Sequence, residues 1–314
     1  MTAAPVLSVS GLTVLAGDAR GARGPMGAGG ADGARGAGAP ARRLVDDVSF
    51  TLGAGERLAV IGESGSGKSL TALAVAGLLA PGLQARGSVS VAGTEVVGAP
   101  EAVLNRVRGA GVSLVFQEPR TALDPLMRIG RQIAEPLRRH RGLRGAELGD
   151  GVRELMREVA LPERAERAFP HEVSGGQRQR VAIAMALACD PKVLIADEPT
   201  TALDVTVQAE ILNLLRREVR ERDMALVFIT HDMGVVAQVA ERVVVLRSGR
   251  KVEEGDVAGT IAAPRHPYTR RLVEGARLLD AALAGTWRPG AVGDAGVGDA
   301  AVTGPAGGEG SVEP

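Results

Sequence analysis

One short stretch decides the fold of this chain, and it reads Gly62-Glu63-Ser64-Gly65-Ser66-Gly67-Lys68-Ser69. It matches the pattern G-x-x-x-x-G-K-[ST], in which a glycine-rich loop joins a strand to a helix. The flanks agree, because Arg57–Ile61 is a short apolar strand and Ser69–Leu79 is helix-like. The backbone N–H groups of such a loop wrap the phosphates of a nucleotide, aided by the positive end of the helix dipole. The stretch predicts a nucleotide site, with Lys68 on the β- and γ-phosphates and Ser69 on Mg²⁺.

Outward from this loop, strands and helices alternate along the chain. Short segments rich in β-branched residues predict further buried strands at Val112–Phe116, Val193–Ala196, Ala225–Ile229 and Val243–Leu246. Between Arg128 and Ala168, charged residues recur at helical spacing and predict a helical insert. This alternation is typical of a largely parallel sheet covered on both faces. We therefore expect an α/β fold of the phosphate-loop NTPase (RecA-like) type with a helical subdomain.

The composition narrows the class of protein further. The chain has 314 residues, 45% of them hydrophobic, and a formal net charge of zero. Balanced charge gives no electrostatic reason to expect nucleic acid or an anionic membrane as the main partner. The single cysteine, Cys189, excludes an internal disulfide. The sequence contains neither a secretory signal nor an apolar run of the ~20 residues that a membrane span needs. We expect a protein of the reducing cytoplasm that only other subunits could hold at a membrane.

Two segments differ from the rest in composition. Residues 17–41 are largely Gly, Ala and Arg and lie between the strand-like Leu7–Leu15 and Leu44–Leu52. They are expected to form a long flexible hairpin loop. Residues 290–314 have almost nothing to bury and are expected to be a disordered tail.

A pair of carboxylates follows one of the predicted strands. Val193–Ala196 leads directly into Asp197 and Glu198, at the carboxyl end of a strand, where ligands of parallel sheets bind. An acidic pair by itself is more often a solvated turn, but the phosphate loop makes a functional pair the better interpretation. Asp197 suits the coordination sphere of Mg²⁺. Glu198 suits a general base that polarises the attacking water.

A second glycine-containing helix start lies at Ser174-Gly175-Gly176-Gln177, ahead of the apolar helix Val181–Ala188. Ser174 is a suitable N-cap, and the two glycines leave helix N–H groups open to an anion. An ordinary capped helix is the alternative interpretation. One phosphate loop already holds the nucleotide, so a second anion-binding helix start needs a purpose.

This combination resembles the ATP-binding cassette (ABC) ATPases. Ser174-Gly175-Gly176-Gln177 is similar to their signature motif, Gln117 to their Q-loop glutamine, Thr201-Ala202-Leu203-Asp204 to their D-loop and His231 to their switch histidine. The similarity extends over about residues 7–279. It implies an ATPase domain at residues 1–280, with a core at 1–100 and 170–262. The helical subdomain would lie at about 100–170 and a C-terminal extension at 262–280.

The resemblance also implies a mechanism. Two cassettes pack head to tail, so that each ATP lies between one phosphate loop and the partner's signature motif. Ser174 and Gly176 would contact the γ-phosphate bound by the partner, with Gly175, Gln177 and Asp204 also at this shared nucleotide site. His231 would contact the γ-phosphate and position the water of Glu198. Gln117 would sense Mg²⁺ or the water and signal to the helical insert.

Four segments resemble one subfamily, the ATPases of dipeptide, oligopeptide and nickel importers. They are Val115–Pro125, Pro170–Val173, Ala196–Thr206 and Pro264–Arg270. Two features depart from the family's pattern. No aromatic residue that could stack on adenine occurs around Leu12–Ala16, and no cysteine cluster follows Pro264–Arg270, so no iron–sulfur site is inferred.

The resemblance implies a motor subunit on the cytoplasmic face of the cell membrane. Its partners would be a second ABC ATPase subunit and two permease subunits, and indirectly an extracytoplasmic substrate-binding protein. Two alternatives stay open, a soluble ABC ATPase of DNA repair or translation and a phosphate-loop kinase. Short, charge-balanced Arg patches argue against a nucleic-acid partner. A kinase would not need the signature motif or the D-loop.

Overall fold

The computed structural model describes residues 4–17, 41–118, 122–201 and 203–283. The predicted hairpin loop at 17–41 lies outside these residues except for its two ends, and the predicted tail at 290–314 lies outside them entirely. By its internal contacts the chain divides into two units, Met1–Ala276 and Arg277–Pro314. The account below concerns the first unit.

A mixed sheet carries the phosphate loop. Its strands, in spatial order, are β10 (Arg250–Asp256), β9 (Arg242–Arg247), β3 (Arg57–Ile61), β8 (Ala225–Thr230), β7 (Val193–Asp197) and β6 (Val112–Val115). All neighbours pair in parallel except β10, which runs antiparallel to β9. Every residue of β7 and β8 is buried, as expected of parallel strands with both faces covered. The predicted parallel sheet is confirmed, and each predicted strand has its counterpart.

A second, antiparallel sheet was not predicted. Its strands, in spatial order, are β2 (Arg42–Leu52), β1 (Leu7–Ala16), β4 (Leu83–Val91) and β5 (Thr94–Glu95). Most of β4 is exposed or half-buried. Its sequence, Leu83-Gln84-Ala85-Arg86-Gly87-Ser88-Val89-Ser90-Val91, nevertheless alternates between apolar and polar residues, so the pattern of a strand was present and could have identified it. The two strand-like segments that flank the predicted loop do form a strand pair, β1 with β2.

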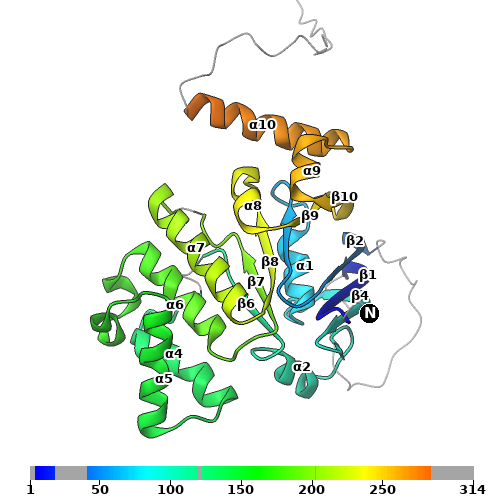
Figure 1. The fold of residues 1–314 in the computed structure, drawn as a ribbon. Coiled ribbons are helices and arrows are strands. Elements are labelled where there is room, and N and C mark those ends of the chain that lie inside the picture. The colour runs from blue at the N-terminus through cyan, green and yellow to red at the C-terminus, as the bar shows by residue number, and fades with distance from the viewer. Residues whose placement is uncertain (1–3, 18–40, 119–121, 202, 284–314) are drawn as a thin grey trace, which may run out of the picture. The chain divides into compact units, whose positions relative to one another are not determined.

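Helices cover the mixed sheet on both faces (Figure 1). They are α1 (Lys68–Val75), α2 (Glu101–Val107), α6 (Gly175–Leu187), α7 (Val205–Glu221), α8 (Met233–Val239), α9 (Val257–Ala262) and the part of α10 (Pro267–Leu283) that belongs to the first unit. The predicted helical insert contains α4 (Ile129–His140), α5 (Gly145–Glu158) and the 3₁₀ turn η1 (Glu163–Arg167), and a second 3₁₀ turn, η2 (Pro170–Glu172), follows. Figure 1 shows α4 and α5 packed together beside α6.

The helix after the phosphate loop is shorter than predicted. We expected Ser69–Leu79, whereas α1 ends at Val75. Gly77 ends it, because its φ of 64° is the left-handed conformation that terminates many helices. A side chain at this position would also collide with Leu104 at 2.9 Å.

The side chains of β7 alternate between two hydrophobic cores. Val193 and Ile195 pack with α1 and the antiparallel sheet, whereas Leu194 and Ala196 pack with α4, α5, α6 and α7. This alternation follows from the two-residue period of a strand. It leaves Asp197, the next residue, at the edge of the sheet, where β7 ends.

A third core lies on one face of β3 and β9. Ala59 and Ile61 of β3 pack there with Val243 and Val245 of β9 and with Tyr268 near the start of α10. The strand that leads into the phosphate loop is thus held on this face by the C-terminal part of the first unit.

No helix in the described part of the chain is both long enough and apolar enough to cross a membrane.

Candidate nucleotide site

The phosphate loop joins β3 to α1, as the sequence predicts. Gly62 has no room for a side chain, since a Cβ there would lie 2.2 Å from the backbone oxygen of Leu246. Gly67 is the N-cap of α1 with a φ of 99°, a conformation that glycine adopts without strain. No side chain caps this helix start. Its first N–H groups therefore have no side-chain partner, and an anion can satisfy them.

Lys68 lies folded back onto its own loop. Its Nζ donates to the carbonyl oxygens of Gly62 at 2.8 Å and Glu63 at 3.1 Å, and the side chain is almost fully buried. Burial lowers the pKa of Lys68, and the negative charges of Glu198 and Asp197 oppose this shift. An ammonium group held this way is already placed where phosphate oxygens would arrive, and such oxygens would offset its desolvation.

A cavity of about 690 Å³ lies over the loop. Its lining residues are Gly62 to Leu70, Gln117, Glu198, Thr201, His231 and Leu272. A cavity of this size suits a ligand as large as a nucleotide. The structure therefore gathers the whole phosphate loop, Gln117, Glu198 and His231 around one space, although they come from four separate segments of the chain.

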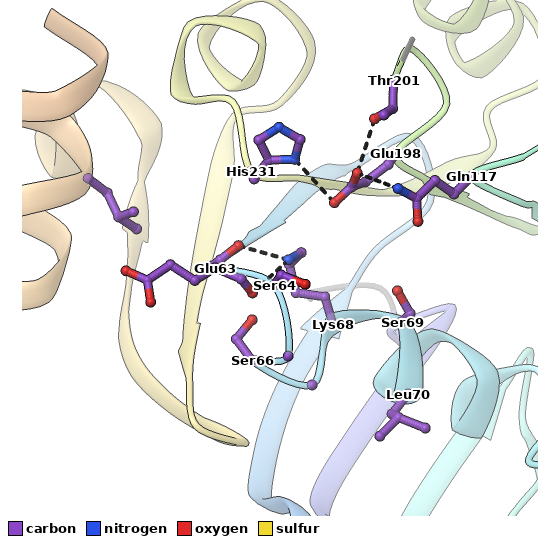
Figure 2. A pocket seen from close by; sticks show the side chains of 14 residues that line it. Glu63, Ser64, Ser66, Lys68, Ser69, Leu70, Gln117, Glu198, Thr201 and His231 are labelled. Carbon is purple, nitrogen blue, oxygen red and sulfur yellow. Dashed lines mark hydrogen bonds and ion pairs between the residues drawn. The ribbon is translucent and has the colours of Figure 1, made fainter. Parts of the chain in front are cut away.

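Three side chains hold the carboxylate of Glu198 (Figure 2). Its Oε2 accepts from Gln117 Nε2 at 2.9 Å and from Thr201 Oγ1 at 3.0 Å, and its Oε1 lies 3.2 Å from His231 Nδ1. The backbone of Glu198 has a φ of 46°, which is uncommon for a residue other than glycine. Strained backbone of this kind clusters at functional sites, where the surrounding structure enforces it. Glu198 is thus a fixed carboxylate beside a phosphate-binding loop.

One carboxylate oxygen of Asp197 has no hydrogen-bond partner among the described residues. Its carboxylate accepts a hydrogen bond from Ser69, while Oδ1 is buried with no hydrogen-bond partner among the described residues. Burial raises the pKa of Asp197, against the hydrogen bond from Ser69 and the charge of Lys68. A hydroxyl next to a buried carboxylate oxygen without a partner is a donor set that fits Mg²⁺. The described residues contain no cluster of three or more His, Cys, Asp or Glu side chains that could hold a metal.

The signature motif does not line this cavity. Ser174 caps α6, accepting from the N–H of Gln177 at 3.2 Å, and Gln177 Oε1 accepts from the N–H of Ser174 at 3.1 Å. Gly176 is buried, and a Cβ there would lie 2.5 Å from Val207 of α7. The packing of α6 against α7 therefore favours glycine at position 176, in addition to the predicted contact with phosphate. Gly175 has more room, with Leu203 the nearest neighbour at 3.6 Å.

Asp204 lies outside the cavity as well. Its side chain accepts from the N–H of Val207 at 3.0 Å and so caps α7. The predicted site residues therefore fall into two groups. One surrounds the cavity, and the other consists of the first turns of α6 and α7, while Asp197 accepts from Ser69 of the phosphate loop without lining the cavity itself.

Sequence reasoning missed three residues at the cavity. Thr201 was recognised only as part of the D-loop, although its hydroxyl donates to Glu198. Its position three residues after Glu198, in the same turn, is the signal that could have identified it. Leu70 follows directly on the loop. Leu272 comes from α10, and no local pattern links it to a loop some two hundred residues earlier.

Comparison with known proteins agrees with this geometry. The ABC transporter family matches residues 45–201. The oligopeptide transport ATP-binding protein OppD of Salmonella typhimurium is 48% identical over 238 residues, which cover 75% of this chain and 71% of that protein. OppD of Escherichia coli is 47% identical over 239 residues, 76% of this chain and 71% of that protein.

Solved structures show the same fold. The ATP-binding cassette MJ0796, solved as a dimer in a post-hydrolysis state with ADP and Pi, has a TM-score of 0.66 at 27% identity, covering 80% of this chain and 98% of that one. The cassette cbiO1 from Clostridium perfringens, part of the transporter complex cbiONQ, also has a TM-score of 0.66, covering 89% and 95% at 22% identity. At that identity it supports the fold alone.

The fold and the family predicted from the motifs are thereby confirmed, as is the resemblance to peptide-importer ATPases. The chain belongs to the ABC transporter family and is an ATP-binding, ATP-hydrolysing cassette of the α/β phosphate-loop type.

Proposed function

We propose that the chain is the motor subunit of an ABC importer of peptides, acting with Mg²⁺ at the cytoplasmic face of the cell membrane. The observation that carries the proposal is the carboxylate of Glu198, held by Gln117, Thr201 and His231 over the cavity of the phosphate loop. A carboxylate fixed in this way can orient a water and remove its proton.

The residues of the cavity divide the work of hydrolysis. The loop from Gly62 to Ser69 binds the phosphates through its N–H groups, and Lys68 compensates their negative charge. Glu198 accepts a proton from the attacking water, while His231 and Gln117 fix the direction of its carboxylate. Ser69, Asp197 and Gln117 would hold Mg²⁺, which when bound neutralises charge on the phosphate oxygens.

A second copy of the fold would complete each site. The first turn of α6, Ser174 to Gln177, is outside the cavity of its own chain, and Ser174 is exposed. We propose that it contacts the γ-phosphate held by a partner cassette, with Asp204 near the same interface. The dimeric state of MJ0796 supports this arrangement. Donors that reach the γ-phosphate only on closure would couple hydrolysis to dimer formation.

The permease would bind between the core and the helical subdomain, which we place at about residues 100–170. A groove of about 370 Å³ lies there, and its lining includes Leu78, Phe116, Pro136 and Met185. Phe116 is 40% exposed and Leu78 is 38% exposed, which is unusual for large apolar side chains and typical of a contact surface. We propose that an amphipathic helix of one permease subunit binds in this groove, and that the partner cassette receives the second permease subunit in the same way.

Peptide is the proposed cargo because relatives that are 47% and 48% identical to this chain are oligopeptide transport ATP-binding proteins. The substrate itself would be bound by the permease and by an extracytoplasmic binding protein. Reconstitution of the chain with its permease and binding protein in vesicles would test this. ATP-dependent uptake of a labelled tripeptide, without uptake of Ni²⁺, is the expected result, and the reverse pattern would exclude peptide import.

Glu198→Gln tests the catalytic part of the proposal. The amide keeps the shape of the side chain but loses the base, so turnover should fall by roughly 10²-fold or more while MgATP still binds. Glu163→Gln, the same change on the exposed turn η1, is the matched control and should hydrolyse ATP at the wild-type rate. A rate for Glu198→Gln close to that of wild type would show that Glu198 is not the base.

A further inference from the structure

The C-terminal part of the first unit reaches the phosphate loop through one tyrosine. The hydroxyl oxygen of Tyr268 accepts a hydrogen bond of 2.8 Å from the backbone N–H of Glu63. Tyr268 is only 1% exposed and packs with Ala59 and Ile61, which belong to the strand that leads into the loop. Phenylalanine would fill the same apolar space, so what the tyrosine adds is the hydrogen bond between its hydroxyl and the N–H of Glu63.

Residues of β9 and β10, and the turn before α10, fix the position of Tyr268. The guanidinium of Arg247, at the end of β9, lies 5.1 Å from the centre of the Tyr268 ring, within the range of a cation–π contact. The N–H of Tyr268 donates to His266 Nδ1 at 3.1 Å. Just before it, the carboxylate of Glu253 in β10 accepts from the N–H groups of Arg265 and His266, each at 2.9 Å. The start of α10 is thereby fixed to the mixed sheet.

Glu63, which hydrogen-bonds to Tyr268, also accepts a hydrogen bond from the phosphate-binding Lys68. Glu63 donates its N–H to Tyr268, and its carbonyl oxygen accepts from Lys68 Nζ at 3.1 Å. A shift of Glu63 therefore moves an acceptor of the lysine and changes where the ammonium lies. Leu272 is on the same face of α10 as Tyr268, one turn further on, and lines the nucleotide cavity itself. Figure 2 shows α10, in orange, on the Glu63 side of the cavity.

We infer that Tyr268 is a positioning residue of the nucleotide site, which makes affinity for MgATP depend on the C-terminal segment from His266 to Leu272. The inference rests on the proposed binding of MgATP by the phosphate loop. With the hydroxyl present, the loop is held in its phosphate-binding shape before the nucleotide arrives. Without it, the N–H of Glu63 has lost its acceptor, and binding must restore the geometry of Glu63 and Lys68.

The variant Tyr268→Phe tests this in the full-length chain. It removes the hydroxyl and keeps the ring in its apolar surroundings. The Kd for MgATP, measured by calorimetry, should rise roughly three- to tenfold, the factor expected for one hydrogen bond. The KM should rise by a similar factor, while kcat at saturating MgATP should change less than twofold, because Tyr268 does not touch the reacting atoms. The unfolding temperature without nucleotide should stay close to that of wild type.

Ser49→Ala is the matched control. It also removes a hydroxyl that accepts a backbone N–H at 2.8 Å, in this case from Gly11 in the antiparallel sheet, and Ser49 does not line the nucleotide cavity. This variant should bind MgATP as wild type does. An unchanged Kd for Tyr268→Phe, or an equal rise for Ser49→Ala, would overturn the inference.

A second variant covers the case in which Tyr268→Phe does not fold. Arg247→Met removes an exposed guanidinium from the tyrosine ring without emptying the core. It should raise the Kd for MgATP about twofold, a smaller effect because the hydroxyl remains. If Arg247→Met bound as tightly as wild type in that case, the inference would fail. Failure of the wild-type chain to bind MgATP would instead overturn the proposed function, and this inference with it.

Discussion

The helices α1 and α6 both have glycine at their starts, but their first turns are built differently. The N-cap of α1 is Gly67, which has no side chain to cap the helix, and this start lies in the nucleotide cavity. The N-cap of α6 is Ser174, whose hydroxyl and N–H both bond to Gln177 in a reciprocal cap. The first start needs an outside acceptor for its donors. The start of α6 supplies hydrogen-bond partners for some of its own N–H groups, and Ser174 is exposed outside the cavity.

The difference shows what one chain can do alone. The start of α1 is surrounded by Lys68, Glu198 and the rest of the cavity, so a single chain has what it needs to bind a nucleotide. The start of α6 is capped by its own residues and lies outside the cavity of its own chain. The proposed contact with phosphate would then involve a second chain, and we expect nucleotide binding and turnover to be separable by mutation.

The largest effect is expected at the first helix start. Lys68→Ala removes the buried ammonium that faces the phosphates, so affinity for MgATP should fall by about 10²-fold or more and turnover should disappear. Lys192→Ala is the matched control, because Lys192 is exposed and lines no part of the cavity. Calorimetry with MgATP and an ATPase assay measure the two effects. Wild-type affinity in Lys68→Ala would mean that the loop does not bind the phosphates.

At the second helix start, binding and turnover should separate. Ser174→Arg places a bulky cation where the partner's γ-phosphate would lie. It should leave MgATP affinity of the single chain within about twofold of wild type, because Ser174 is outside that chain's cavity. Hydrolysis should fall to background. A wild-type rate of hydrolysis would exclude the head-to-tail arrangement and favour a kinase-like use of the phosphate loop.

Mixing Ser174→Arg with Lys68→Ala sharpens this test. In a mixed dimer one shared site carries both defects and the other carries neither. ATPase activity should therefore return and should be greatest at equal amounts of the two variants. Lack of recovery would show that both sites must be intact before either can hydrolyse ATP. The rate of Ser174→Arg alone would still decide between the head-to-tail dimer and a kinase-like use of the phosphate loop.

The sequence predicted residues that act within one short segment much better than those that act across the fold. The phosphate loop, Asp197 and Glu198 each follow a buried strand, so their place at the edge of the sheet could be inferred from order along the chain. The contact between Tyr268 and Glu63 joins residues 205 positions apart and leaves no local pattern. The strand β4, by contrast, alternates between apolar and polar residues from Leu83 to Val91, so it could have been predicted from its own sequence. The roles assigned to Ser174, Gly176 and Asp204 stay predictions, since they depend on a second chain.

Asp197→Asn should trade activity for stability. Burial raises the pKa of Asp197, so the charged carboxylate weakens the fold at neutral pH. The amide carries no charge, and it should stabilise the nucleotide-free protein by on the order of 1 kcal/mol while removing the oxygen proposed for Mg²⁺ and most turnover. Thermal unfolding at several pH values measures this. The stabilisation should be full above the raised pKa and vanish as the pH falls below about 3.9, the ordinary pKa of an aspartate, because the carboxyl then becomes neutral in both folded and unfolded chains. A less stable amide variant at pH 7 would contradict this account.

The smallest effect concerns Asp204, where two roles can be separated. Its carboxylate caps α7 through the N–H of Val207, and Val207 packs on Gly176 in the first turn of α6. Asp204→Ala should lose the cap, lower the free energy of unfolding by about 1 kcal/mol and loosen the start of α6 with it. Asp204→Asn keeps an equally good cap and loses only the charge. If Asp204 also acts at the shared nucleotide site, Asp204→Asn should unfold at the wild-type temperature and yet hydrolyse ATP several-fold more slowly. Wild-type turnover in Asp204→Asn would assign the residue to capping alone, and the shared site would then consist of the first turn of α6 without the D-loop.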